Sequence, residues 1–418
     1  MLLAKPSEFI TSITSNTNPT SINKTIKFVG KITKGTDIPI DTKVSYEEFI
    51  NGILKRKGYA SLNQDIILEH QISNPTWYFV RLKMVDSKNK NIFIKNKQTS
   101  AGKGILVSPE NIPFSSTRPN DFDTFWNLQR KSLDLVPIKV LEKKTLTKNP
   151  NSTLVAYDVK ISCAGSRPVS GILTIPRSAK LKSLPAFVFF QGAGVSTAVS
   201  FGGYGRNAIT FMVNAHGIDN MKEKTYYQNL SKTKLKNYAH FSKDNRDKIY
   251  FKDMFLRVMR SLDYVKSLPE WNGKILVARG GSQGGAQAIV AAAMDKQVTL
   301  LVAEVPAMCN HNGFLAPIPR RSGWPNFYTN KGVKNNIIKA TSYYDMINFA
   351  FRIHCESYIT TGLTDLVCSP IGIACLFNAI ASPKKHFLVH PTGDHVSTQT
   401  DSQFTSKFTQ RIIEHFKE

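Results

Sequence analysis

A single serine stands among glycines in the segment "GGSQGG", residues 280–285. An apolar run at residues 274–279 ends there and small helix-forming residues follow, which indicates a sharp turn from strand to helix. A serine hydroxyl attacks a carbonyl only when a base removes its proton and when the hydroxyl stands clear of the sheet. Gly280 and Gly284, two residues before and after Ser282, leave room for such a turn. The segment predicts a nucleophile at Ser282, with a plain glycine-rich turn as the alternative.

This chemistry also needs an acid and a histidine, which follow the serine in that order in strand–helix architectures of this kind. Asp365 lies in a loop after the apolar run at 357–362, and His395 lies in a loop after the run at 385–390. A carboxylate at a strand end can reach the far ring nitrogen of a histidine and fix its orientation. We therefore predict Asp365 as the acid and His395 as the base.

Two other residues compete for these roles. Asp394 adjoins the histidine in sequence, but its side chain is expected to point elsewhere. His390 is a second candidate base, although its place at the end of a strand is more typical of a partly buried structural histidine.

Two backbone N–H groups must face the oxyanion that forms during attack on a carbonyl. Gln283, directly after the nucleophile, supplies one of them, and the loop "FFQGAGVS" after an earlier strand is expected to supply the other. We predict Ala193 as this second donor, with an ordinary glycine-rich turn as the alternative. Gln191 in the same loop and Trp324 in "RSGWPNFY" are candidates for lining the substrate site, although an aromatic residue in a partly buried lid explains Trp324 equally well.

The elements that must position these residues are strands that alternate with helices. Short apolar runs predict strands at residues 185–191, 208–213, 274–279, 299–305, 357–362 and 385–390. Between the second and third runs, apolar residues from Tyr250 to Val265 recur at helical spacing. This alternation predicts an α/β fold with a mostly parallel sheet, in which ligands bind beyond the carboxyl ends of the strands.

The first hundred residues have a different pattern of apolar and turn-forming residues. From about residue 21 to residue 104, short β-branched and aromatic runs are separated by Gly, Asn, Pro and Lys, which predicts antiparallel strands. A stretch rich in Pro and Ser follows. We therefore expect a small β-sandwich domain at residues 1–108 and a catalytic domain at residues 109–418, with Asp121 or Asp123 capping the first helix of the second domain.

Composition narrows the function. The 418 residues are 41% hydrophobic and 20% charged, and no apolar run approaches the ~20 residues that span a bilayer, so no membrane span is expected. The net charge of +25 would attract polyanions. The lysines are scattered, however, without a basic helix or a nucleic-acid motif, so we expect a solvated basic surface and no specific nucleic-acid partner.

Neither the spacing of the cysteines nor the metal-binding motifs that we looked for indicate a redox or metal site. The five cysteines have no CxxC spacing and several lie in apolar segments, which favours buried free thiols over disulfides. The sequence has no HExxH, paired CxxC or acidic calcium loop, so no metal and no other cofactor is expected.

Several segments together resemble the acetyl xylan esterase and cephalosporin C deacetylase family of α/β-hydrolases. The resemblance runs from about Arg118 to the C-terminus. With its expected N-terminal β-sandwich, the chain is similar to secreted bacterial members of this family that degrade polysaccharides. The segments are "RPNDFDTFW", "FQGAGV", "GGSQGGAQAIVAAAMD", "YYDMINFAFRI", "GLTDLVCSP" and "FNAIASPKKHFLVHPTGDH".

The resemblance implies a serine esterase of the α/β-hydrolase fold that removes acetyl groups from xylan or oligosaccharides without a cofactor. It implies the triad Ser282, Asp365 and His395, with oxyanion donors at Ala193 and Gln283. Homo-oligomers are frequent in the family and are expected here. Many members carry His-Gly-Tyr in the oxyanion loop and Cys-Pro-Pro after the acid, where this chain has Gln-Gly-Ala at 191–193 and Cys-Ser-Pro at 368–370.

Two other functions remain as alternatives. A serine peptidase of the same fold would also combine an accessory β domain with such a triad. A non-catalytic protein that binds glycans or polyanions would use the basic surface instead. The resemblance favours a secreted or periplasmic protein, no leader is visible in "MLLAKPSEFITS", and the sequence leaves a cytoplasmic location open.

Overall fold

The protein is described by a computed structural model. It covers residues 11–15, 22–32, 41–94, 97–98, 100–115, 117–149, 151–199, 207–328 and 334–418. Residues 1–10, which bear on the question of a leader, lie outside this part of the chain.

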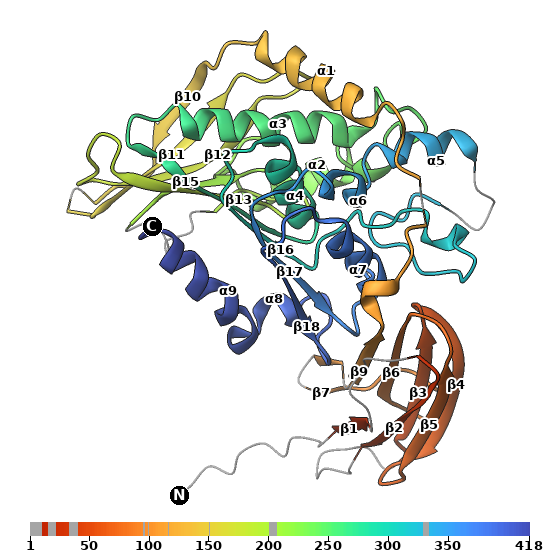
Figure 1. Ribbon diagram of the computed structural model, residues 1–418. Helices are drawn as coiled ribbons and strands as arrows, with labels where there is room; N and C mark the ends of the chain where they lie inside the picture. Colours follow the sequence, from red (N-terminus) through yellow and green to blue (C-terminus); the bar gives the residue numbers. More distant parts are fainter. Residues whose placement is uncertain are drawn as a thin grey trace, which may run out of the picture.

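The N-terminal residues form antiparallel sheets that pack face to face (Figure 1). One sheet has the order β1-β2-β5, with β1 at Thr11–Ser15, β2 at Lys24–Ile32 and β5 at Ile66–Ile72. The other has the order β4-β3-β6-β9, with β4 at Ile53–Ser61, β3 at Lys43–Ile50, β6 at Thr76–Val85 and β9 at Ser100–Val107. A small pair joins β7 (Phe93–Ile94) to β8 (Lys97–Gln98).

Alternation along β6 shows why this part forms a sandwich. Tyr78, Val80 and Leu82 point into the core between the two sheets, whereas Trp77 and Phe79 point to the opposite face and join the core of the C-terminal part. The expected N-terminal antiparallel sheets are therefore confirmed. A boundary between domains at residue 108 stays a prediction.

The rest of the chain is built on one large sheet of order β10-β11-β12-β14-β13-β15-β16-β17-β18. The strands are β10 (Val140–Thr145), β11 (Leu154–Ile161), β12 (Val169–Pro176), β13 (Leu184–Phe190), β14 (Ile209–Val213), β15 (Trp271–Gly281), β16 (Leu300–Glu304), β17 (Glu356–Gly362) and β18 (Lys385–His390). Pairing is parallel from β14 to β18 and antiparallel from β10 to β14. The predicted mostly parallel sheet is confirmed, and the antiparallel edge of β10, β11 and β12 was not expected.

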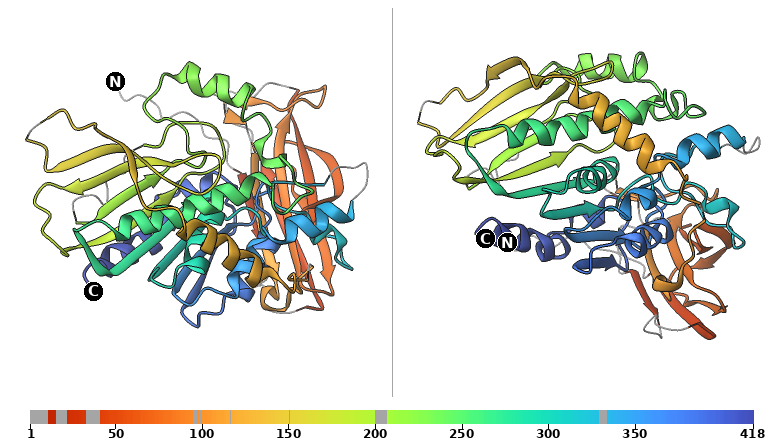
Figure 2. Two further views of the ribbon diagram at one scale, coloured as in Figure 1. Left: turned by 90° about the horizontal axis from the view of Figure 1, so that it is seen from above. Right: turned by 45° about the horizontal axis from the view of Figure 1, so that its top comes forward.

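Helices cover both faces of this sheet (Figures 1 and 2). On one face lie α1 (Phe122–Asp134), α3 (Tyr250–Lys266), α4 (Gln283–Met294), α6 (Met346–Ala350) and α7 (Pro370–Ala379). The opposite face carries α8 (Ser397–Thr400) and α9 (Ser402–His415). Shorter or peripheral helices are η1 (Pro109–Asn111), α2 (Lys224–Lys232), η2 (Tyr238–His240), η3 (Gly313–Leu315) and α5 (Asn335–Ser342).

Two expectations about single residues have clear outcomes. Asp121 precedes α1, but neither it nor Asp123 caps the helix with its side chain. Asp121 instead pairs with Arg246, and Asp123 pairs with Arg118, because a full ion pair attracts the carboxylate more strongly than a backbone N–H. The capping expectation is therefore wrong. The five cysteines are free, as expected.

Among the described residues, no helix combines the length and apolar character that crossing a membrane would require.

The face covered by α9 depends on a few aromatic and aliphatic contacts. Phe408 of α9 is fully buried against Val277 and Val302 of the sheet, and the guanidinium of Arg279 lies over its ring at 4.9 Å. We expect Phe408→Ala to lower the free energy of unfolding by about 3–5 kcal/mol, because it opens a cavity that the sheet cannot close. Urea unfolding measures this, with Leu135→Ala, at a residue 85% exposed, as the control that should change little.

Candidate active site

Ser282 occupies the turn between β15 and α4 with a backbone conformation that side chains rarely adopt. Its φ is 57° and its ψ is −123°, a region that costs roughly 1–3 kcal/mol for a non-glycine residue. Neighbouring backbone groups hold this conformation: the Ser282 N–H donates to Glu304 O at 2.9 Å, and Ser282 O accepts from Ala307 N at 3.0 Å. The turn projects the hydroxyl away from the end of the strand.

The turn leaves no room for a side chain at either of the two flanking glycines. A Cβ at Gly280 would lie 2.3 Å from the backbone of Gly284, and a Cβ at Gly284 would lie 2.1 Å from the carbonyl oxygen of Phe190. Both neighbours are backbone atoms, which cannot rotate away as a side chain could. The spacing of glycines noted in the sequence thus has a direct steric cause.

The loops after β17 and β18 bring Asp365 and His395 to the same end of the sheet. His395 Nδ1 donates to Asp365 Oδ2 at 2.8 Å, and His395 Nε2 lies 3.0 Å from Ser282 Oγ. The Asp365 side chain is fully buried, and its Oδ1 accepts from the N–H groups of Val367 and Cys368 at 2.7 and 2.9 Å. These distances allow the imidazole to take the proton of the serine hydroxyl while the carboxylate fixes the ring.

The two competing residues are engaged in other contacts. The Asp394 carboxylate accepts from the N–H groups of Val396 and Ser397, at 3.0 and 2.7 Å, and so shapes the turn after His395. His390 Nε2 lies 3.2 Å from Asp401 Oδ2 at the start of α9. Neither is brought to Ser282.

A pocket of about 440 Å³ opens over the serine. It is lined by Phe189, Gly192, Ala193, Gly281, Ser282, Trp324, Val367, His395 and Gln399. Ala193 and Trp324 both lie beside Ser282 in this pocket, and their roles stay predictions. Gln283 is the first residue of α4, where backbone N–H groups have no acceptor within the helix and the helix dipole favours negative charge.

Gln191, the other residue expected to line this site, instead forms hydrogen bonds that stabilise the loop in which it lies. Its Nε2 donates to Ser196 Oγ at 2.7 Å and to Thr197 O at 3.0 Å, and its Oε1 accepts from Ala215 N at 3.3 Å. The side chain of Gln191 is not among those that form the wall of the pocket.

Two side chains on α4 form hydrogen bonds to the loop that carries Ala193, and the sequence did not suggest them. Gln283 Nε2 donates to Gly192 O at 3.3 Å while its Oε1 accepts from the Tyr238 hydroxyl at 2.6 Å. One helical turn later, Gln287 Nε2 donates to Gln191 O at 2.9 Å. The signal for this role was the placement of two glutamines at i and i+4 on an otherwise apolar helix.

His216 is a second support that the sequence did not suggest. It is fully buried, its Nε2 lies 2.8 Å from Gly194 O, and its Nδ1 lies 2.7 Å from the Tyr250 hydroxyl. Burial lowers the pKa of His216 to about 4. The neutral ring therefore donates to the Gly194 carbonyl and accepts from Tyr250, and it fixes the loop that carries Ala193.

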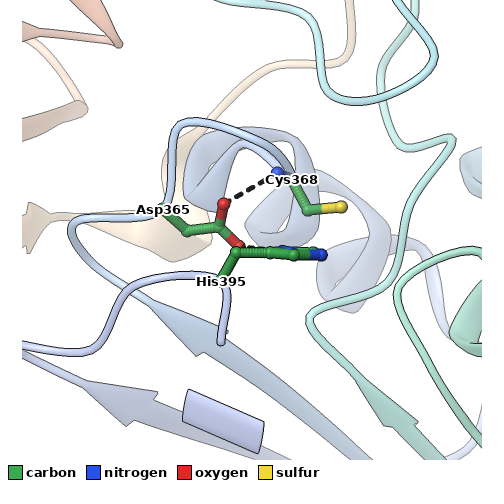
Figure 3. A group of neighbouring side chains, drawn as sticks. All are labelled: Asp365, Cys368 and His395. Carbon is green, nitrogen blue, oxygen red and sulfur yellow. Dashed lines mark hydrogen bonds and ion pairs between the residues drawn. The ribbon is translucent and has the colours of Figure 1, made fainter. Parts of the chain in front are cut away.

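Cys368 adds a thiol beside the acid and the histidine (Figure 3). The thiol and the imidazole extend in the same direction from the Asp365 carboxylate, and one donor atom of each of the three residues lies within 4.8 Å of the others. Oxygen, sulfur and nitrogen donors of this kind could hold a soft metal ion. However, burial and the charge of Asp365 raise the pKa of the Cys368 thiol well above its usual range, and the carboxylate and ring nitrogens already have partners. The group is better suited to orienting the imidazole than to binding a cation.

Comparison with known proteins identifies the family of the chain. A family model described as "Acetyl xylan esterase (AXE1)" matches residues 113–411. The chain belongs to this family. Acetyl esterase Axe7A of Xylanibacter ruminicola is 32% identical over 298 residues, which cover 70% of the chain. The matched segment spans 66% of the length of that relative.

Two solved structures of acetyl xylan esterases have the same fold. The enzyme from Paenibacillus sp. R4 aligns with a TM-score of 0.61 at 21% identity, over 74% of this chain and 98% of that one. The enzyme from Thermoanaerobacterium sp. JW/SL YS485 aligns with a TM-score of 0.52 at 20% identity, over 71% and 95% of the two chains. The α/β-hydrolase fold expected from the resemblance is thereby confirmed.

The burial of His216 predicts a specific dependence of stability on pH. Its imidazole takes up a proton near pH 6.5 in the unfolded chain and near pH 4 in the folded protein, so unfolding binds a proton between these values. The free energy of unfolding should fall by up to about 3 kcal/mol as the pH falls from about 6.5 to about 4. Chemical unfolding at a series of pH values tests this, because His216→Asn should lose this part of the slope. An unchanged slope in the variant would contradict the assignment.

Proposed function

We propose that the protein is a serine ester hydrolase that removes acetyl groups from acetylated carbohydrates, with Ser282 as nucleophile, His395 as base and Asp365 as orienting acid. The observation that carries the proposal is the chain of contacts from Asp365 Oδ2 through the imidazole to Ser282 Oγ, 2.8 and 3.0 Å long. Membership in the acetyl xylan esterase family supports the acetyl group and the carbohydrate.

In the proposed first half-reaction, His395 Nε2 removes the proton of Ser282 as Oγ attacks the acetyl carbonyl carbon. The backbone N–H groups of Ala193 and Gln283 donate to the oxyanion, where the N-terminus of α4 also favours the charge. When the tetrahedral intermediate collapses, the imidazolium returns the proton to the departing sugar oxygen. The acetyl group is left on Ser282.

In the second half-reaction, water takes the place of the sugar. His395 removes a proton from the water, whose oxygen attacks the acetyl carbon, and the same donors hold the second oxyanion. Collapse releases acetate and restores the proton to Ser282 Oγ. Throughout, Asp365 accepts from the Nδ1–H of His395 and fixes the ring, so that Nε2 remains free to exchange protons.

The walls of the pocket suit a sugar ester. Phe189 and the half-buried Trp324 offer apolar faces against which a sugar ring can pack. Gln399 adds a polar group, since its Nε2 is held by His395 O at 2.6 Å while its Oε1 is directed toward Gly281. An acetylated carbohydrate is therefore our proposed substrate, and assembly into homo-oligomers and action outside the cytoplasm remain predictions from the family resemblance.

We expect Ser282→Ala to reduce the turnover of p-nitrophenyl acetate and of acetylated xylan by several orders of magnitude, because no other group supplies the attacking oxygen. Acetate release measures this. Ser231→Ala, at an exposed serine of α2, is the matched control and should keep the activity of the unaltered protein. Undiminished turnover in Ser282→Ala would refute the assignment.

The same panel separates the alternatives. A peptidase of this fold would cleave peptide amides faster than acetyl esters. A non-catalytic binder of polyanions would show binding that weakens steeply with salt, and Ser282 would not react with a fluorophosphonate. We expect fluorophosphonate labelling of Ser282 and preference for acetyl esters.

A further inference from the structure

The N-terminal sheet β4-β3-β6-β9 rests directly on the loops that carry Asp365 and His395. In Figure 1 it lies against the ends of β17 and β18, beside α7. One face of this sheet closes the core of the β-sandwich, and the other contributes Phe49, Trp77, Phe79 and Leu106 to the core of the catalytic part. The N-terminal residues therefore pack into the same core as the catalytic part of the chain.

The loop of the acid is held from this sheet by a buried hydrogen bond. Trp77 Nε1 donates to Leu363 O at 2.9 Å, two residues before Asp365, although the two partners are 286 positions apart in the chain. Trp77 is fully buried and stacks on Phe79 with ring centres 4.8 Å apart. A buried carbonyl that loses its donor is unfavourable, so Leu363 is fixed to the indole.

The other side of the same loop is held through Arg321. Its Nε donates to Leu366 O at 2.8 Å, one residue after Asp365. Its backbone N–H donates to Asn51 O at 2.8 Å, in the turn between β3 and β4, and the Asn51 side chain accepts from the Trp77 N–H at 2.9 Å. The carbonyls on both sides of the acid are thus tied to one corner of the N-terminal sheet.

The loop of the base is reached by the neighbouring strand. The Gly104 N–H of β9 donates to Pro391 O at 2.8 Å, four residues before His395. The approach is so close that a Cβ at Gly104 would lie 2.5 Å from Leu363 O, and a Cβ at Gly102 would lie 2.8 Å from the Thr364 side chain. One strand edge therefore touches both triad loops at once.

We propose that this corner of the N-terminal sheet is a positioning element for the triad, in which Trp77 and Gly104 set the distance between Asp365 and His395. The proposal rests on the proposed function, because it concerns the same acid and base. The physical reason is that only one residue separates Leu363 from Asp365, so a displaced carbonyl moves the carboxylate with it. Misplacement of a catalytic group by about 1 Å can lower a rate by about a hundredfold.

The first test compares Trp77→Phe with Tyr78→Phe in the full chain. Each variant removes one buried hydrogen-bond donor from the same strand, but the Tyr78 hydroxyl donates to Glu48 within the sandwich, at 2.7 Å. We expect kcat for p-nitrophenyl acetate to fall about tenfold or more in Trp77→Phe with little change in KM, and to stay near the unaltered value in Tyr78→Phe. Thermal unfolding of both variants ensures that folded protein is compared.

A spectroscopic measurement reports the geometry without turnover. The proton between His395 Nδ1 and Asp365 should give a far-downfield ¹H resonance in the unaltered protein. We expect this resonance to shift or broaden in Trp77→Phe and to be unchanged in Tyr78→Phe. Equal kcat and equal resonances in the two variants would overturn the proposal.

The second test uses glycines of the same sheet. Gly104→Ala should lower kcat because its methyl group meets the Leu363 backbone. Gly58→Ala is the control from the same sheet: its methyl group would meet the hydroxyl end of the Tyr46 ring, with Oη at 2.1 Å, Cζ at 2.2 Å and Cε1 at 2.7 Å, so it also crowds a neighbour but touches neither triad loop. Equal kcat in Gly104→Ala and Gly58→Ala would contradict the proposal.

The two proposals fail in different ways. If the unaltered protein does not hydrolyse acetyl esters, the proposed function fails, and the downfield resonance still decides whether Trp77 positions the acid. If Trp77→Phe loses activity on acetylated xylan but not on p-nitrophenyl acetate, the N-terminal sheet binds glycan instead, and the positioning role is wrong.

Discussion

The positive-φ backbone conformation of Ser282 is the constraint on which the candidate site depends. A serine holds this conformation only when its surroundings over-determine it. The carbonyl of Glu304 and the amide of Ala307 fix it from β16 and the loop beyond. The side chain of Glu304 is itself held in a buried ion pair with Arg279, three residues before Ser282. Removing one partner of such a pair would leave an uncompensated buried charge, so the pair ties β15 to β16 beside the serine.

From this fixed point, the parallel sheet supplies the remaining groups. β13, β15, β17 and β18 all end at the same edge, so their following loops bring Ala193, Ser282, Asp365 and His395 to one place. Each loop is then held by a different neighbour. Gln283, Gln287 and His216 hold the loop of Ala193, whereas the N-terminal sheet contacts the loops of Asp365 and His395.

The sequence predicted the parts of the fold whose signal is local. Runs of apolar residues marked the parallel strands, and the glycine spacing around Ser282 marked the turn because part of its cause is local, the crowding of Gly280 against the backbone of Gly284. By contrast, every described side chain of β10 is exposed, and its sequence "VLEKKT" carries no alternation that would identify an antiparallel edge strand. Supports such as Trp77, 286 residues from its partner, or His216, whose role depends on burial, could not be recognised because their partners are set by tertiary packing.

The most direct test of the account is to trap the acetyl group in transit. The protein would be mixed briefly with p-nitrophenyl acetate, quenched in acid and digested, and its peptides would be analysed by mass spectrometry. The account predicts one acetyl group on Ser282, formed in a burst and then lost as acetate appears. Acetate release without an acetylated Ser282, or acetylation that accumulates on another residue in step with turnover, would contradict it.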